Sequence, residues 1–434
     1  MWTDSEILYH IYPLGACGAP VENDGITVSR ILTIKNYIPH LKKLGVGGVY
    51  FSPLFESDRH GYDTRDYFKI DCRLGTNEDF KSVCDELHKN GIKVILDGVF
   101  NHVGRGFYQF QDVLKNRENS AYKDWFYINF GGNTHYNDGL WYDAWEKHYE
   151  LVKLNLHNPA VTDYLFKAIE FWINEFKIDG LRLDVAYCLD RNFMKSLRNF
   201  AKQKKDFVLI GEVLFGDYNQ FVNDNMLHSC TNYENYKSLY SSFNTKNLFE
   251  LSYSLNRQFG YDNWCIYRNK HLVTFTDNHD VSRFATILSN KNLIKLGYGM
   301  LFTMPGIPTL YYGSEWGMEG DKKDGDNALR PFVEYPQENA LTEDIKRFIQ
   351  IRKSNPVFSF GGYKNIVEAN EFLVFERAYN GKRALVGLNI SQEVKTAHQN
   401  SLSGNFKDAV TGMKETLNGN FVLPPESIII LISE

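Results

Sequence analysis

The sequence predicts an α/β fold, a (β/α)8 TIM barrel with a small insertion domain after its third strand and an antiparallel β-sandwich at the C-terminal end. Three observations support this prediction. Apolar runs alternate with amphipathic stretches along most of the chain, as a barrel requires. Several runs stop at charged residues, as strands that carry functional groups to a barrel rim do. After Pro356 the pattern changes to short strand-like runs separated by turns.

The first three barrel strands follow directly from the apolar runs. ILYHIYP at 7–13 and GGVYFSP at 47–53 are expected as the first and second strands, with IPHLKKLG as a helix end before the second. Residues 77–90 place apolar side chains at helical spacing and are followed by Gly91, which predicts a helix that ends there. Residues 93–100 are then expected as the third strand.

A long insertion follows the third strand. Residues 103–155 are rich in Tyr, Trp, Asn and Gly and lack a steady period, and the segment far exceeds an ordinary connection between a strand and a helix. Its aromatic residues argue against disorder. We therefore expect a small domain, in which Trp141, Tyr142 and Trp145 either pack together or contact a ligand.

The barrel is expected to continue after the insertion, so that it comprises residues 1–102 and 156–356. Helices are predicted at 160–176, 193–204, 293–302 and 343–354, and strands at 180–186, 207–213, 232–238, 272–278 and 309–315. The remaining residues, 357–434, contain FLVFERAY, RALVGLNI, KDAVTG and IIILIS between turn-forming residues, which favours an antiparallel β domain.

Three acids stand at the ends of predicted strands: Asp184, Glu212 and Asp280. Each alone could be a salt-bridged surface carboxylate, but their recurrence in successive strand ends favours a common site. Arg182 precedes Asp184 by two positions, so both side chains should share a face of the strand. We expect this pairing to keep Asp184 ionised. Glu212 follows an apolar run, and a less polar setting would help it to keep its proton.

An ionised carboxylate facing a protonated one, about 5 Å apart, is the arrangement of retaining glycoside hydrolases. The segments DGVFNH, GLRLDVA, GEV and FTDNHD occur in this order and resemble the four sequence regions of the α-amylase family. HGYDTRDYFKID, LVKLN and GIPTLYYGSEWG extend the resemblance, which covers residues 7–356 approximately. LVKLN is similar to the segment found in the neopullulanase and cyclomaltodextrinase branch.

The resemblance implies specific roles for individual residues. Asp184 would be the nucleophile, Glu212 the acid/base and Asp280 the third carboxylate, which holds sugar hydroxyls. Tyr62 would stack on the sugar ring, and three further side chains would hydrogen-bond the hydroxyls or the nucleophile: His102, Arg182 and His279. The implied activity is retaining hydrolysis of α-1,4-glucosidic bonds in maltooligosaccharides, cyclodextrins or related α-glucans.

Two alternatives stay open beside hydrolysis. A 4-α-glucanotransferase uses the same intermediate with a sugar acceptor, and no residue in the sequence separates the two. A non-catalytic carbohydrate-binding protein of the same fold should have lost one of the three acids, and all are present. Members of the resembled branch commonly carry a further N-terminal β domain that helps to form a dimer, whereas the first barrel strand is expected here at Ile7. The oligomeric state is left open.

No cofactor is required by the implied chemistry, and calcium is a weaker expectation. Asn101 matches a usual calcium-ligand position of the family, but Tyr187 and Cys188 replace the Lys-His pair that normally follows the nucleophile. Calcium needs six to eight oxygen ligands. The loop EGDKKDGDN at 319–327 could also hold an ion, although a solvated loop at the rim of the cleft is the simpler interpretation. No metal ligand is therefore assigned.

Charge and composition set limits on the partners. The formal net charge is −5, and no block of Lys and Arg indicates a nucleic-acid partner. No stretch of 18 apolar residues predicts a membrane span. The N-terminal residues MWTDSEILYH lack the basic and apolar regions of a secretory leader, so a cytoplasmic enzyme is expected.

Overall fold

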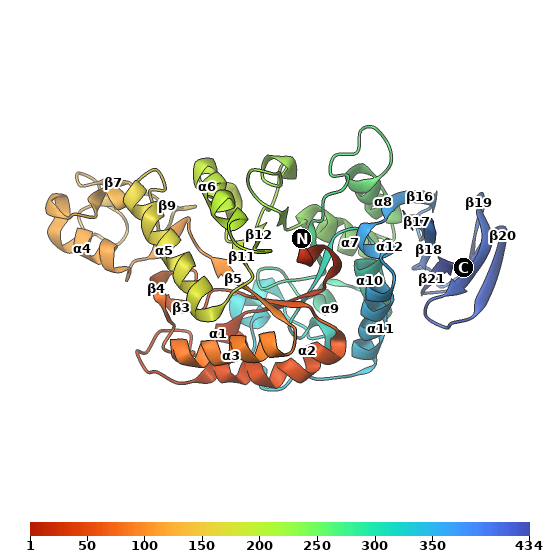
Figure 1. Cartoon of the computed structure of the whole chain (residues 1–434), viewed down its shortest axis with the longest axis horizontal. Coiled ribbons are helices and arrows are strands. Elements are labelled where there is room, and N and C mark those ends of the chain that lie inside the picture. Colours follow the sequence, from red (N-terminus) through yellow and green to blue (C-terminus); the bar gives the residue numbers. More distant parts are fainter.

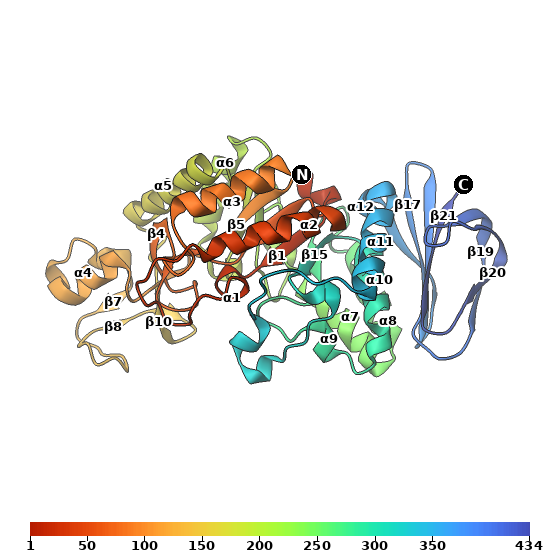
Figure 2. The ribbon, with the colours of Figure 1, turned by 90° about the horizontal axis from the view of Figure 1, so that it is seen from below.

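The computed structural model describes all residues, 1–434, and its centre is a closed parallel barrel (Figures 1 and 2). The strand order β13-β12-β11-β5-β2-β1-β15-β14 follows the chain around the ring, and a bridge between Thr231 and Val273 joins the two ends. The predicted (β/α)8 barrel is thus confirmed. The strands are β1 Leu8–Ile11, β2 Gly48–Phe51, β5 Lys93–Gly98, β11 Gly180–Leu183, β12 Val208–Gly211, β13 Ser229–Cys230, β14 Val273–Phe275 and β15 Ile307–Tyr311.

Helices surround these strands and begin at residues that cap them. Thr76 and Asp79 form a capping box at the start of α3, and Asp190 accepts backbone N–H groups at the start of α6. Such caps satisfy N–H groups that have no partner within the helix. The main helices are α2 Ile38–Leu44, α3 Asn77–Lys89, α5 Pro159–Phe176, α6 Arg191–Lys202, α7 Tyr233–Thr245, α8 Leu248–Phe259, α10 Ile294–Thr303 and α11 Ala340–Ser354.

The sixth strand lies elsewhere than the sequence predicts. Residues 232–238, expected as a strand, form the start of α7, and the sixth strand is the two-residue β13. The side chain of Asn232 accepts the backbone N–H of Asn235 and caps the helix. A strand of two residues is too short to produce a hydrophobic period, which is why the pattern pointed to the neighbouring helix.

The insertion forms its own small sheet beside the barrel, at the left of Figure 1. Three strands pair in the order β6-β10-β9, and a separate hairpin pairs β7 with β8. Phe110 and Tyr142 are fully buried and their rings meet edge to face. The elements are β6 His102–Gly104, α4 Tyr108–Asn116, β7 Ile128–Asn129, β8 Trp141–Tyr142, β9 Ala144–Trp145 and β10 His148–Lys153. That the insertion is a separate domain with the bounds 103–155 stays a prediction.

The C-terminal residues form one six-stranded antiparallel sheet in the order β16-β17-β18-β21-β19-β20. β18 contacts β20 although they are not paired, so the sheet folds over and encloses a second core. The predicted antiparallel β fold is confirmed. KDAVTG, expected as a strand, is only the end of β19 and the turn after it. The strands are β16 Gly362–Glu368, β17 Phe372–Tyr379, β18 Lys382–Asn389, β19 Lys395–Asp408, β20 Lys414–Leu423 and β21 Ser427–Ser433.

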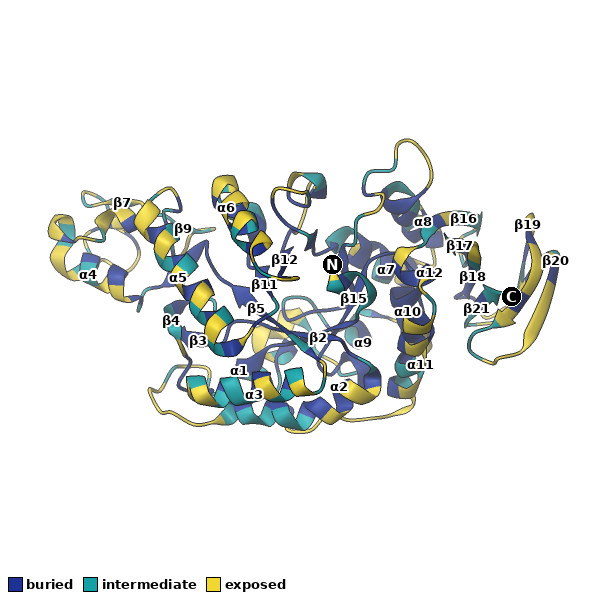
Figure 3. Cartoon of the chain, in the orientation of Figure 1, coloured by how far each residue is buried: buried dark blue, intermediate teal, exposed yellow.

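Burial follows these layers (Figure 3). All residues of β1, β2, β11 and β12 are buried, as expected for parallel strands covered by helices on the outside of a barrel. β19 and β20 are mostly exposed, with only three buried residues each. None of the helices combines the length and the apolar composition needed to cross a lipid bilayer.

Candidate active site

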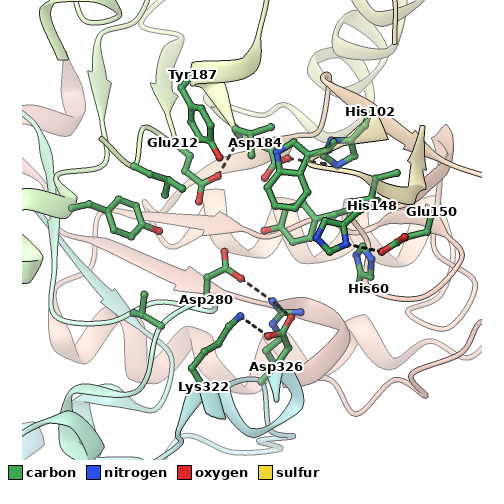
Figure 4. A pocket seen from close by; sticks show the side chains of 18 residues that line it. His60, His102, His148, Glu150, Asp184, Tyr187, Glu212, Asp280, Lys322 and Asp326 are labelled. Carbon is green, nitrogen blue, oxygen red and sulfur yellow. Dashed lines mark hydrogen bonds and ion pairs between the residues drawn. The ribbon is translucent and has the colours of Figure 1, made fainter. Parts of the chain in front are cut away.

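Strand register brings the predicted charged residues to one end of the barrel. Arg182 on β11 lies opposite Asp97 on β5, and Asp184 and Glu212 come directly after β11 and β12. Asp280 follows β14 by a short turn. Because the carboxyl ends of parallel strands meet at the same rim, Asp184, Glu212 and Asp280 converge on one cleft of about 620 Å³. Figure 4 shows Asp184 and Glu212 on one side of this hollow and Asp280 on the other.

Arg182 is the only cation between three of these acids. Its guanidinium donates to Asp97 at 2.7 Å and to Asp184 at 3.1 Å, and it forms an ion pair with Glu212 at 2.6 Å. All four side chains are buried. A buried charge needs compensation, and here one positive charge is divided over three carboxyl groups.

This sharing corrects the expectation that Arg182 keeps Asp184 ionised. Burial raises the pKa of Asp184 well above its usual range, and the attraction of Arg182 only partly opposes that effect. The nearby carboxyl groups of Glu212 and Asp97 add to the rise. Burial likewise raises the pKa of Asp97, to about 6. The substrate-free site therefore favours a proton on this group of acids.

The setting of Glu212 also differs from the expectation. Besides the ion pair with Arg182, its second carboxylate oxygen accepts the backbone N–H of Val185 at 3.1 Å. Glu212 is thus a buried side chain with two polar contacts that the apolar run before it does not predict, and its role as the acid stays a prediction. Val185 adopts a φ of 37°, which is rare for a β-branched residue. The hydrogen bond to Glu212 is one contact that holds this strained turn after Asp184.

The negative charge of Asp280 is compensated more strongly than that of the other acids. Its carboxylate lies 3.0 Å from His279 Nε2 and 2.9 Å from Arg330 Nη2. Burial by itself would raise the pKa of Asp280, but His279 and Arg330 outweigh it and hold that pKa well below its usual range. Arg330 in turn donates to the carbonyl of His279 and lies over the ring of Tyr12 at 4.5 Å. Asp280 is thus an ionised carboxylate at neutral pH.

Of the four predicted sugar-binding residues, Tyr62 and His102 line the cleft, whereas Arg182 and His279 are buried and contact the acids that line it. Tyr62 stands in the loop between β3 Phe55–Ser57 and β4 Thr64–Ile70. Its ring stacks against that of His279, and its hydroxyl donates to Asp97 at 3.2 Å. His102 Nε2 is 3.9 Å from Asp184 and has no hydrogen-bond partner. Burial lowers the pKa of His102 to about 3, so the imidazole is neutral.

The structure adds cleft residues that the sequence did not single out. Arg330 has no strand or helix pattern around it, and sequence reasoning had no signal for it. Of the three aromatic residues of the insertion that were expected either to pack or to contact a ligand, Trp145 lines the cleft. Tyr142 is buried, and Trp141 lies outside the cleft lining. Lys322 and Asp326 come from the loop 319–327, which was expected at the rim of the cleft, and Tyr187 also lines it. The added lining residues are His60, His148, Glu150, Leu151, Val185, Leu214, Tyr233, Val281 and Arg330.

Calcium binding stays a prediction, and the residues considered for it make the following contacts. No three His, Cys, Asp or Glu side chains gather as metal ligands, and the amide of Asn101 contacts the neighbouring His102. In the loop 319–327, Asp321 pairs with Lys323, and Asp326 pairs with Lys322 and Arg330.

Comparison with known proteins identifies the family. A sequence profile described as "Alpha amylase, catalytic domain" matches residues 24–356. The chain belongs to the α-amylase family and is a glycoside hydrolase. This α-amylase family member is 32% identical to a cyclomaltodextrinase of Thermoanaerobacter pseudethanolicus over 99% of its own length and 78% of the relative's. It is 31% identical to an intracellular maltogenic amylase of Bacillus subtilis over 80% and 60% of the two chains.

Solved structures of the family agree with the fold. A cyclic alpha-maltosyl-(1→6)-maltose hydrolase from Arthrobacter globiformis superposes with a TM-score of 0.85 at 25% identity and covers both chains completely. A cyclomaltodextrinase superposes with a TM-score of 0.87 at 29% identity, over 100% of this chain and 78% of that one. The barrel and the C-terminal sheet described above are therefore those of the α-amylase family.

Proposed function

We propose that this glycoside hydrolase cleaves α-1,4-glucosidic bonds in maltooligosaccharides, cyclodextrins or related α-glucans, with retention of the anomeric configuration. The observation that carries the proposal is the convergence of Asp184, Glu212 and Asp280 on one cleft. The names of the relatives, cyclomaltodextrinase and maltogenic amylase, support this class of substrate.

In the proposed mechanism two carboxyl groups act in two steps. The carboxylate of Asp184 attacks the anomeric carbon while Glu212 gives its proton to the departing glycosidic oxygen. Glu212 then takes a proton from water, whose oxygen attacks the same carbon and releases Asp184. Two inversions at one carbon retain its configuration.

The remaining cleft residues bind and orient the sugar. Asp280 is ionised and can accept hydrogen bonds from two hydroxyls. His102 is neutral, and its unpaired Nε2 can donate to a hydroxyl next to Asp184. Tyr62 offers an aromatic ring to the sugar face. Arg182 is buried and orients Asp184 and Glu212, because it contacts both.

Product analysis tests the reaction class. With maltotriose, hydrolysis should give maltose and glucose, and proton NMR should detect the α-anomer before mutarotation. Major products longer than maltotriose would replace the hydrolase proposal with a 4-α-glucanotransferase. Initial rates on maltoheptaose, β-cyclodextrin, pullulan and starch would then rank the substrates.

A trapping experiment tests the nucleophile. A 5-fluoro-α-glucosyl fluoride should inactivate the enzyme, and peptide mass spectrometry should find the sugar on Asp184. Labelling of a different carboxylate would reassign the roles, and inhibition without a covalent adduct would contradict the proposed intermediate.

A further inference from the structure

A second cavity lies at the opposite end of the barrel from the cleft. It has a volume of about 140 Å³ and is lined from the loop after α8, from the residues before β15, and from α12 Val357–Phe360 and the start of β16. His271 and Gly306 line it and lie two residues before β14 and one residue before β15, so it opens at the N-terminal ends of the strands. In Figure 1, α8, α12 and β16 meet in this region.

The wall of this cavity is positively charged. Arg268, Lys270 and Arg377 line it together with His271, and no Asp or Glu is among the lining residues. This contrasts with the protein as a whole, whose net charge is −5. A concave wall of one sign concentrates ions of the opposite sign.

A fourth cation lies behind this wall. Arg352 donates to the carbonyl of Gly306 at 2.6 Å, and Arg377 donates to the carbonyl of Gly361 at 2.7 Å. Both arginines are 1% exposed, and Nε of Arg352 has no hydrogen-bond partner. Burial and the positive charge of Arg377 lower the pKa of Arg352 to about 9, and burial lowers that of Arg377 to about 9. Both groups remain charged at neutral pH.

None of these four cations has a carboxylate partner. Arg268 and Lys270 bond only to backbone carbonyls, those of Gly260, Asp262 and Val222. Arg352 and Arg377 likewise bond only to carbonyls. Buried charges in proteins are ordinarily paired with a charge of the opposite sign. Burying two guanidinium groups without such a partner costs free energy of folding.

We propose that this cavity binds a small oxyanion, either inorganic phosphate or the phosphate group of a sugar phosphate. A phosphate carries about two negative charges at neutral pH and accepts several charge-assisted hydrogen bonds, which matches a wall whose Arg and Lys side chains have no carboxylate partner. At roughly 30 Å³ for each liquid water molecule, the cavity has room for the five heavy atoms of the ion. The site is separate from the hydrolytic cleft, and its occupancy does not depend on the proposed reaction.

Isothermal titration calorimetry at constant ionic strength tests the proposal, with inorganic phosphate, glucose 1-phosphate and glucose as probes. The wild-type chain should bind one phosphate or one glucose 1-phosphate in a saturable manner, and glucose should not compete. Tighter binding of glucose 1-phosphate than of phosphate would identify a phosphomonoester site, and the reverse a site for the free ion.

The matched variants separate this site from general charge effects. Arg268→Gln combined with Lys270→Gln should weaken phosphate binding at least about tenfold, because each removes a charged donor. Lys202→Gln combined with Lys205→Gln removes the same charge from two exposed lysines at the end of α6 and should leave binding unchanged. Absence of saturable binding by the wild type, or equal binding by both double variants, would overturn the proposal.

Discussion

The guanidinium of Arg182 lies 2.6 Å from Glu212 and 3.1 Å from Asp184. One cation thus contacts both carboxyl groups that we assign to the chemical steps, and it also contacts Asp97 at 2.7 Å. Three ionised acids around one cation carry an excess of two negative charges, and each proton that the group holds removes one of them. The protonation of this group therefore controls when Asp184 can act as a nucleophile.

The pH dependence of kcat/KM should report this group. The pKa of Asp184 is raised by burial, and the nucleophile must be ionised, so kcat/KM should fall as pH drops through the raised pKa. The midpoint of this acid limb should lie well above pH 4, near which an ordinary Asp titrates. Initial rates on maltotriose between pH 4 and pH 9 at constant ionic strength would measure it.

Asp97→Asn provides the internal control for this profile. The charge of Asp97 is one cause of the raised pKa of Asp184, so the variant should move the acid limb to lower pH. A wild-type midpoint near pH 4, or a shift to higher pH in the variant, would contradict the assignment of the limb to Asp184.

Asp184→Asn should separate activity from stability. Turnover should fall by at least about three orders of magnitude, because the amide cannot form the glycosyl ester. The folded-state pKa of Asp184 is raised, so its ionisation costs stability at neutral pH, and that cost disappears with the amide. The midpoint of thermal unfolding at pH 7 should therefore rise, by about 2 °C.

Calorimetry and a rate assay on the same preparation would check both effects. Asp163→Asn, an exposed acid on α5, should change neither quantity. Retention of a tenth of the wild-type rate by Asp184→Asn would remove it as the nucleophile, and a large loss of stability would contradict the electrostatic account.

The barrel could be predicted from the sequence wherever a strand had enough residues to show its pattern. β5, β11 and β12 were located because short apolar segments, VIL, GLRL and FVLIG, lead directly into Asp97, Asp184 and Glu212. β13 was missed because two residues carry no period, and the cap formed by Asn232 lay inside the predicted strand. In the C-terminal sheet, β17 and β21 were found from their apolar residues, whereas β20 was missed because many of its side chains are exposed.

The acids of the site were predicted, but their electrostatics were not. Spacing along β11 correctly put Arg182 next to Asp184, since alternate residues share a face. It could not show that Arg182 also reaches Asp97 and Glu212, because these contacts cross between strands. Arg330 and His279 together lower the pKa of Asp280. Arg330 lies in an irregular loop, where no periodic sequence pattern could predict its position.

Glu212→Gln should slow the glycosylation step most for substrates whose leaving group must be protonated. The departing sugar of a natural glucan is a poor leaving group and must be protonated. The pre-steady-state rate of glycosylation by the variant should therefore fall by about 100-fold or more. A 2,4-dinitrophenyl maltoside needs no acid and should be affected by less than about tenfold. Stopped-flow release of the phenolate and quenched-flow analysis of maltotriose would give the two rates. Equal slowing of both substrates would exclude Glu212 as the acid.

Trp145→Ala should weaken the binding of glucans while sparing the chemical step. The ring of Trp145 forms part of the cleft wall, where it lies 6.1 Å from His102 and nearly parallel to His148. Loss of an aromatic contact of roughly 1 kcal/mol corresponds to an increase in KM for maltoheptaose of about fivefold, with kcat within about twofold of the wild-type value. Trp141→Ala is the matched control, because this tryptophan belongs to the same insertion but lies outside the cleft lining. An equal change of KM in both variants would show that the insertion contributes through its packing and that the Trp145 ring does not contact the sugar.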